Sequence, residues 1–105
     1  MRPPASDQKQ GCLQHAIKIL GDKWTPLILN ELSFSPCTFS DLEKNLPGIS
    51  PRTLSQRLDK LCQAKIVSKV IYCERPPRNQ YSLTPKGTEL KEVLTAMSSW
   101  GAKYC

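Results

Sequence analysis

This 105-residue sequence has few of the groups on which enzymes and metal sites depend. It contains one histidine, His15, and none of its five cysteines stands in a C-x-x-C pair. A zinc site needs about four Cys or His ligands at short spacings. Paired carboxylates, a nucleophile motif and a glycine-rich phosphate loop are also missing. We therefore expect no metal, no cofactor and no enzymatic activity.

Long apolar runs are missing as well. No stretch approaches the roughly 20 apolar residues that span a bilayer, and the start MRPPASDQKQ is polar and unlike a signal peptide. We expect residues 1–10 to be a disordered tail, residues 11–105 to form one domain, and the protein to be cytoplasmic with no membrane partner. An odd number of cysteines in that compartment predicts free thiols.

Positive charge is present and is concentrated in one part of the chain. The net charge is +6, and the segment from Ser50 to Gln80 holds seven basic residues against two acidic ones. A concentrated basic segment is typical of a protein that binds a phosphate backbone.

Apolar periodicity predicts helices in the first half of the chain. One helix is expected over Cys12–Leu20, and a second is expected where Trp24, Leu27, Ile28 and Leu32 share a face. The segment SFSPC is expected to be a loop. Ser40 then resembles an N-cap, with Glu43 completing a capping box for a short helix over Asp41–Leu46.

Turn and cap residues indicate a helix-turn-helix and a wing. Pro47-Gly48 breaks the short helix, and Ser50 caps the next with Pro51 at its first position. IVSKVIYCE and NQYSL predict a hairpin with a basic, proline-stiffened tip. Thr84 caps a last helix. The predicted fold is mainly α with a small β-hairpin, a winged helix-turn-helix in the order α-α-α-α-β-β-α.

The second helix of the motif carries the candidate DNA-binding residues. Its leucines share one face, and the remaining side chains are mostly able to reach phosphates or base edges. These candidates are Ser50, Arg52, Thr53, Ser55, Gln56, Arg57 and Lys60, with Arg75, Arg78 and Asn79 in the wing. Arg52 and Gln56 are predicted to read bases and Arg57 to bind phosphate. The alternative is an ordinary solvated helix face.

The segments GDKWTPLIL, FSDLEKNLPGISPRTLSQRLDKL and PPRNQYSLTPKG resemble successive signatures of HxlR-type bacterial transcriptional regulators, relatives of the MarR group. The resemblance extends from Cys12 to Trp100 and implies a homodimer that binds double-stranded DNA and responds to a small molecule or a reactive species. The chain departs from the family at Gln80, where an acidic residue is usual, and at Lys65, where glycine is common. Lys65 must adopt a left-handed backbone, or the helix must end differently.

The resemblance also implies a dimer interface and a sensor. The family dimerises mainly through its terminal helices, here Cys12–Leu20 and Pro85–Tyr104. The candidate interface residues are Leu13, Ile17, Leu90, Leu94, Met97, Trp100 and Tyr104. Some members sense oxidants or electrophiles through a cysteine at the position of Cys12, where a helix start favours a thiolate. A regulator with a non-covalent ligand and a winged helix that contacts another protein remain the alternatives.

The other cysteines are expected to differ in exposure. Cys37, in a loop, and Cys105, at the C-terminus, are expected to be accessible. Cys62 is expected to be a small buried side chain, and Cys73 fits either a core or an exposed strand position.

Overall fold

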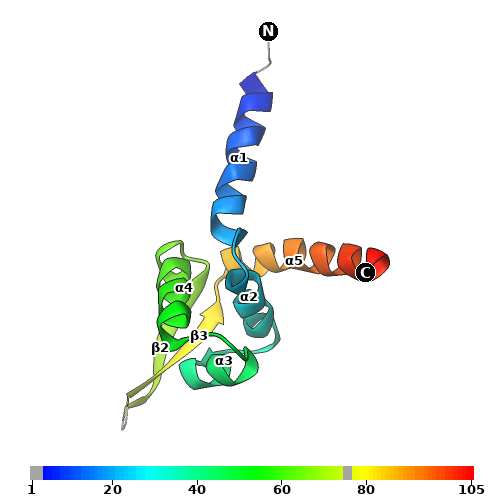
Figure 1. Ribbon diagram of the computed structural model, residues 1–105. Helices are drawn as coiled ribbons and strands as arrows, with labels where there is room; N and C mark the ends of the chain where they lie inside the picture. Colours follow the sequence, from blue (N-terminus) through cyan, green and yellow to red (C-terminus); the bar gives the residue numbers. More distant parts are fainter. Residues whose placement is uncertain (1–3, 75–76) are drawn as a thin grey trace.

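The computed structural model describes the backbone of residues 4–74 and 77–105, and the side chains of residues 11–71 and 78–105. Within these ranges the chain forms five helices and three strands (Figure 1). In chain order they are α1 (Pro4–Leu20), α2 (Trp24–Phe34), β1 (Cys37–Thr38), α3 (Phe39–Asn45), α4 (Pro51–Gln63), β2 (Val67–Glu74), β3 (Pro77–Leu83) and α5 (Pro85–Tyr104). The terminal helices α1 and α5 project away from the body in different directions.

The core lies where α2, α3, α4 and the sheet meet. The leucine face predicted for α4 is confirmed, since Leu54, Leu58 and Leu61 are at most 1% exposed. On α2 the predicted face is partly wrong: Leu27 is 42% exposed, whereas Leu29, outside the predicted stripe, is buried. The surface of α2 that faces the body is wider than a single i, i+3, i+4 stripe, because α2 contacts α3, α4, α5 and β3.

The sheet contains the predicted hairpin and one strand that the sequence did not indicate. Its order is β1-β3-β2, and both pairings are antiparallel. The segment SFSPC is not wholly a loop, because Cys37 pairs with Tyr81 and Thr38 pairs with Gln80. A two-residue strand has no periodicity to detect, so only the pairing reveals it.

Two of the three predicted helix caps are confirmed. The Ser50 hydroxyl accepts a hydrogen bond from the Thr53 backbone at 3.0 Å, and the Thr84 hydroxyl accepts one from Gly87 at 3.1 Å. The prediction for α3 is wrong, because Thr38 rather than Ser40 is the cap and forms its capping box with Asp41. The sequence carries this motif in two overlapping registers. The strand pairing of Thr38 holds it in the extended conformation that an N-cap adopts.

At the end of α4, Lys65 adopts the first of the two expected alternatives, a left-handed backbone with φ of 61°. The Lys65 backbone donates to the carbonyl of Cys62, and Ile66 donates to that of Leu61, each at 3.0 Å. This pair of bonds is the Schellman arrangement in which glycine is usual. The Lys86 ammonium donates a hydrogen bond to the Ala64 carbonyl at 2.8 Å. Carbonyl groups at the end of α4 therefore have hydrogen-bond donors although no glycine follows the helix.

The first helix is longer than predicted. It begins at Pro4 rather than at Cys12, so residues 4–10 are helical where we expected a disordered tail; residues 1–3 of that tail lie outside the described range. The physical reason is that the segment is polar but contains good helix formers, and its proline falls in the first turn, where it is tolerated. The last helix has the predicted bounds, Pro85–Tyr104.

Candidate nucleic-acid interface

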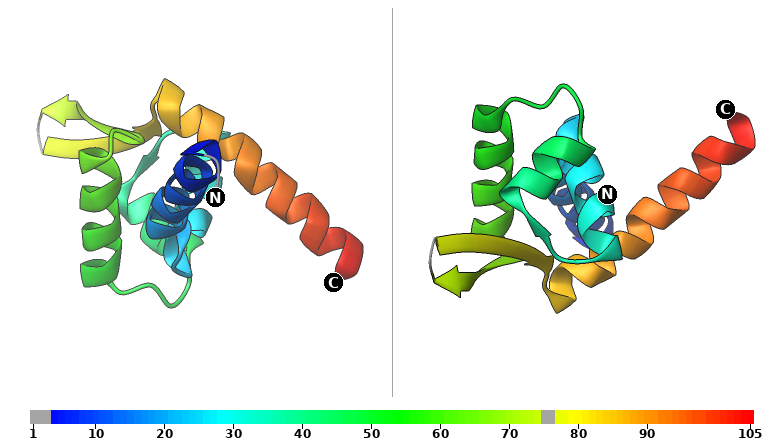
Figure 2. Two further views of the ribbon diagram at one scale, coloured as in Figure 1. Left: turned by 90° about the horizontal axis from the view of Figure 1, so that it is seen from above. Right: turned by 90° about the horizontal axis from the view of Figure 1, so that it is seen from below.

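Helix α4 lies at the edge of the body, and the β2–β3 hairpin lies beside it (Figure 2). The hairpin packs against α4 near the base of the strands and extends past it, so the two elements present adjoining surfaces. The hydrophobic face of α4 fixes this arrangement, because burying its three leucines turns the opposite, polar side of the helix outward.

The predicted base-reading residues are accessible. Arg52 and Gln56 are both exposed, and their spacing of four residues places them on one side of α4, one above the other. Ser55 is exposed as well. The side chains of Arg52 and Gln56 make no hydrogen bond to the described residues. Their donors are therefore available to a ligand that approaches this side of the helix.

Ser50 and Thr53 form the N-terminal cap of α4. Besides accepting from the Thr53 backbone, the Ser50 hydroxyl donates to the Thr53 hydroxyl at 2.9 Å. Both side chains are thus engaged in the cap that starts α4. Gly48, in the turn before it, has φ of 93°, a conformation that glycine alone adopts readily. The turn and the cap together set where the exposed first turn of α4 begins.

Arg57 and Lys60, which were predicted to bind DNA, both contact groups of their own chain. Arg57 is half-buried, and its Nε donates to Asp22 Oδ1 at 3.2 Å in an ion pair. Lys60 is exposed, but its Nζ donates to the backbone carbonyl of Lys18 at 2.9 Å. The partners lie 35 and 42 positions away in the sequence, so no local spacing signals these contacts.

Asp22 is a residue that sequence reasoning did not single out. Its carboxylate accepts from the backbone N–H groups of Trp24 and Thr25 at 2.8 and 2.9 Å, and from the Thr25 hydroxyl at 2.6 Å. Burial acts to raise the pKa of Asp22, but the bonds from Thr25, Trp24 and Arg57 outweigh it, and the pKa is lowered. The carboxylate is therefore charged at neutral pH. The only signal in the sequence was its place in GDKWT, just before a predicted helix.

Two of the three residues predicted as DNA contacts in the wing lie in its described part. Arg78 and Asn79 are exposed on β3, and Arg75 lies outside the described residues. Next to them Val70 and Ile71 on β2 are 56% and 62% exposed, so the hairpin presents apolar as well as basic side chains.

The cysteines do not all lie where the sequence suggested. Cys37 was expected to be accessible but is buried on β1, and burial, together with the negative charges of Asp41 and Glu31, raises its pKa. Cys62 is partly buried, and burial raises its pKa too. Cys12 and Cys105 are exposed. Because α1 begins at Pro4, Cys12 lies well inside the helix. The expectation that a helix N-terminus favours a thiolate at Cys12 therefore does not apply. The side chain of Cys73 lies outside the described range.

The candidate interface residues divide into two groups. Leu94 is buried in the core and Leu90 is partly buried, so both pack within their own chain. The other five are exposed by more than half of their surface; they are Leu13, Ile17, Met97, Trp100 and Tyr104. On α5 the rings of Trp100 and Tyr104 lie against each other with centroids 5.3 Å apart and planes tilted by 43°. The terminal helices therefore leave apolar side chains uncovered in the single chain.

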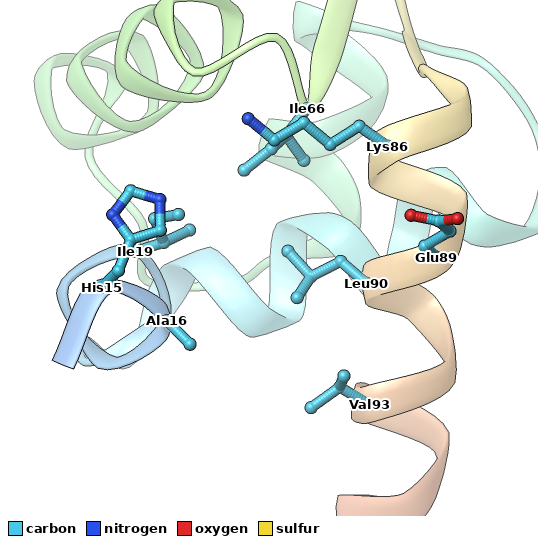
Figure 3. A pocket seen from close by; sticks show the side chains of 8 residues that line it. All are labelled: His15, Ala16, Ile19, Ile66, Lys86, Glu89, Leu90 and Val93. Carbon is cyan, nitrogen blue, oxygen red and sulfur yellow. The ribbon is translucent and has the colours of Figure 1, made fainter. Parts of the chain in front are cut away.

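A mostly apolar cleft of about 280 Å³ separates α1 from α5 (Figure 3). Ala16 and Ile19 of α1 face Leu90 and Val93 of α5, and Ile66 closes one end. Polar side chains at its rim are His15, Lys86 and Glu89. His15 is exposed, in keeping with a surface position.

The described residues contain neither a candidate metal site nor a candidate membrane span. In these ranges no group of three or more His, Cys, Asp and Glu side chains is placed to hold a metal ion. None of the described helices combines the length and the apolar character needed to cross a membrane.

Known sequences resemble this chain over most of its length. The HxlR-like helix-turn-helix family model matches residues 19–105. An HTH-type transcriptional regulator of Synechocystis sp. is 39% identical over 92 residues, which cover 88% of this chain and 68% of that protein. The HTH-type transcriptional regulator YodB of Bacillus subtilis is 34% identical over 93 residues, which cover 89% of this chain and 83% of YodB.

Solved structures resemble the chain as well. The reduced form of YodB gives a TM-score of 0.78 and the diamide-treated form 0.75, both at 32% identity; they cover 100% of this chain and 96% and 97% of YodB. A MarR-family regulator from Porphyromonas gingivalis gives a TM-score of 0.82 at 30% identity, covering 89% of this chain and 91% of that one.

Proposed function

Because the chain belongs to the HxlR-like helix-turn-helix family of transcriptional regulators, we propose that it acts as a homodimer on a roughly palindromic DNA operator. The predicted winged helix-turn-helix fold, the DNA-binding regulatory class and the absence of an enzymatic role are confirmed. The observation that best supports the finer proposal is the exposed polar side of α4 beside the basic hairpin. Two α4 helices would enter successive major grooves about 34 Å apart.

The proposal gives different roles to the two basic elements. Arg52 and Gln56 read base edges, since arginine pairs bidentately with guanine and glutamine with adenine in the major groove. Ser55 lies near them on α4 and contacts the same groove. Arg78 and Asn79 of the hairpin contact the backbone or the minor groove, and Arg75 belongs with them by its place in the sequence.

Replacing Arg52 by alanine is expected to reduce the preference for operator over random DNA by about 1–3 kcal/mol, because a base contact is lost. Arg78→Ala is expected to weaken binding to both DNAs and to make the log–log salt slope less steep by about 0.9, the value for one phosphate. Fluorescence anisotropy titrations with two labelled duplexes, at several salt concentrations, measure both quantities. The operator is the duplex that the wild-type chain enriches most from a random library.

The matched control is Lys91→Ala, which removes one positive charge from an exposed position on α5, beside the end of β3 at Ser82 and Leu83 and away from Arg78 and Asn79 at its other end. It should leave the preference and the salt slope close to those of the wild type. An equal loss on operator and random DNA for Arg52→Ala would contradict its assignment to base reading.

Dimerisation through α1 and α5 is part of the proposal. It is supported by the exposed apolar side chains of Leu13 and Ile17 on α1 and of Met97, Trp100 and Tyr104 on α5. Exposed apolar groups gathered on projecting helices favour an interface, because their burial removes apolar surface from water.

We further propose that the regulator responds to oxidants through Cys12. The support is the exposure of its thiol and the similarity to YodB, of which a diamide-treated form has been solved. Diamide would take two electrons and two protons from a pair of thiols, Cys12 and one other, and join them in a disulfide. Diamide is expected to change operator binding by the wild type and not by Cys12→Ser, with non-reducing gel mobility as a second readout. If both proteins respond alike, another thiol and not Cys12 is the sensor. If neither responds, the cleft between α1 and α5 becomes the candidate site for a non-covalent effector.

A further inference from the structure

Two basic residues of α4 reach back to the corner between α1 and α2 rather than outward. We propose that Asp22, Arg57 and Lys60 are positioning residues that hold the recognition helix against this corner. Arg57 and Lys60 then aim Arg52 and Gln56 at the DNA and do not themselves neutralise phosphates. This inference rests on the proposed DNA-binding role of α4 and specifies how its reading residues are oriented.

The contacts fall on both sides of the corner. Lys60 lies one turn after Arg57 on α4, so the two side chains leave the helix from the same side. The Lys60 ammonium binds the carbonyl of Lys18, in the last turn of α1, at 2.9 Å. The Arg57 guanidinium binds Asp22, two residues before the start of α2, at 3.2 Å. Two adjacent turns of α4 are thus tied to the end of one helix and to the start of the next.

The corner itself is tight. A Cβ on Gly21 would lie 2.5 Å from the carbonyl oxygen of Ile17, so the chain turns here with no space for a side chain. Asp22 is held by three hydrogen bonds from Trp24 and Thr25, and Thr25 is buried. Asp22 therefore offers Arg57 an anchor that is fixed to the core through α2.

Partial burial makes the ion pair more than a surface contact. The side chains of Arg57 and Asp22 are 30% and 24% exposed, so the pair is less screened by solvent and salt than a fully exposed one. Arg57 directly follows Gln56 in α4 and lies one turn after Thr53, which places the anchor next to the reading residues. A rotation of α4 about its own axis would break the pair and turn Arg52 and Gln56 away together.

The two roles of Arg57 predict opposite effects for Asp22→Asn. If Arg57 can bind a DNA phosphate, removing the Asp22 carboxylate releases its guanidinium for that contact, and the affinity for both operator and random DNA rises. If Arg57 is a positioning residue, the preference for operator over random DNA falls about tenfold, a size typical of coupled contacts. Arg57→Ala is expected to cause the same fall, and the double variant no further one. The salt slope is expected to stay at the wild-type value in all three.

The controls separate charge from position. Asp59→Asn removes one negative charge from an exposed position on the same helix and should leave the preference unchanged. Arg57→Lys keeps the charge but lacks Nε, so the preference should fall as in Arg57→Ala, whereas a phosphate contact would largely survive. Lys60→Met should lower the preference without reducing the salt slope. Thermal unfolding by circular dichroism checks that each variant is folded at the assay temperature.

Different results would contradict the positioning role of Arg57 and the proposed DNA-binding function. A salt slope reduced by about 0.9 in Arg57→Ala, or additive effects of Asp22→Asn and Arg57→Ala, would overturn the positioning role and leave the proposed function intact. A wild-type chain that enriches no duplex from the library would overturn both.

Discussion

A Gly87→Ala chain is expected to lose at least about 2 kcal/mol of its free energy of unfolding, because the added methyl group has no space. Gly87 is buried in the first turn of α5, and a Cβ there would overlap the carbonyl oxygen of Ile66. That carbonyl accepts bonds from the Thr84 backbone at 3.0 Å and from the Thr84 hydroxyl at 3.1 Å, so it cannot retreat without losing them. The higher helix propensity of alanine, about 1 kcal/mol, does not compensate.

The matched control is Gly11→Ala. Gly11 lies inside α1, and a Cβ there would meet nothing within 4 Å. The same substitution should therefore stabilise the chain by up to about 1 kcal/mol through helix propensity alone. Urea unfolding followed by circular dichroism measures both variants. A Gly87→Ala chain as stable as the wild type would show that α5 is not packed against Ile66 in this way.

A Met97→Asp chain is expected to be monomeric and to bind the operator about 100-fold more weakly, because one DNA-binding unit loses the advantage of two linked sites. Met97 is 53% exposed on α5, one turn before Trp100, which is 68% exposed. In the proposed dimer these side chains are covered by the partner, and a carboxylate placed among them would be desolvated without a partner charge. Binding to a single half-site should be nearly unchanged.

Ser98→Asp is the control for this variant. It adds the same charge to the neighbouring position of α5, which is exposed and lies in a hollow with Phe34, Lys91 and Thr95 rather than in the one that Met97 shares with Val93 and Trp100. Ultracentrifugation gives the oligomeric state, and anisotropy with full-operator and half-site duplexes gives the affinities. A Met97→Asp chain that stays dimeric would contradict the proposed interface.

Sequence patterns predicted most elements of this fold, and the errors have identifiable causes. The leucine spacing of α4 and the caps Ser50 and Thr84 follow from interactions within a few residues, and they are confirmed. Of the two alternatives left open for Lys65, the structure has the left-handed backbone. The cap of α3 was assigned to Ser40 because the local motif fits two registers. Only the pairing of β1 with β3, between segments distant in the sequence, selects Thr38.

In the candidate DNA-binding surface and around it, too, features that depend on local sequence were predictable, and features that depend on distant segments were not. That Arg52 and Gln56 face away from the core was predictable, because the direction of a side chain on a helix depends only on its distance from the leucines. The burial of Cys37 was not predictable in this way, since it depends on the strand β1 and on its contact with β3. Nor was the exposure of Leu27, which depends on which neighbours surround α2.

The sequence by itself determined that there is a helix with Arg52, Arg57 and Lys60 outside its leucine face, and that a basic hairpin follows it. Helical periodicity is a local property, and it is enough to separate a buried face from a polar one. The tertiary structure was needed to show that Arg57 and Lys60 turn back to Asp22 and Lys18, whereas the Arg52 side chain makes no hydrogen bond to the described residues. A long cationic side chain binds whichever acceptor the fold brings within reach, and that acceptor was 35 residues away from Arg57 in the chain.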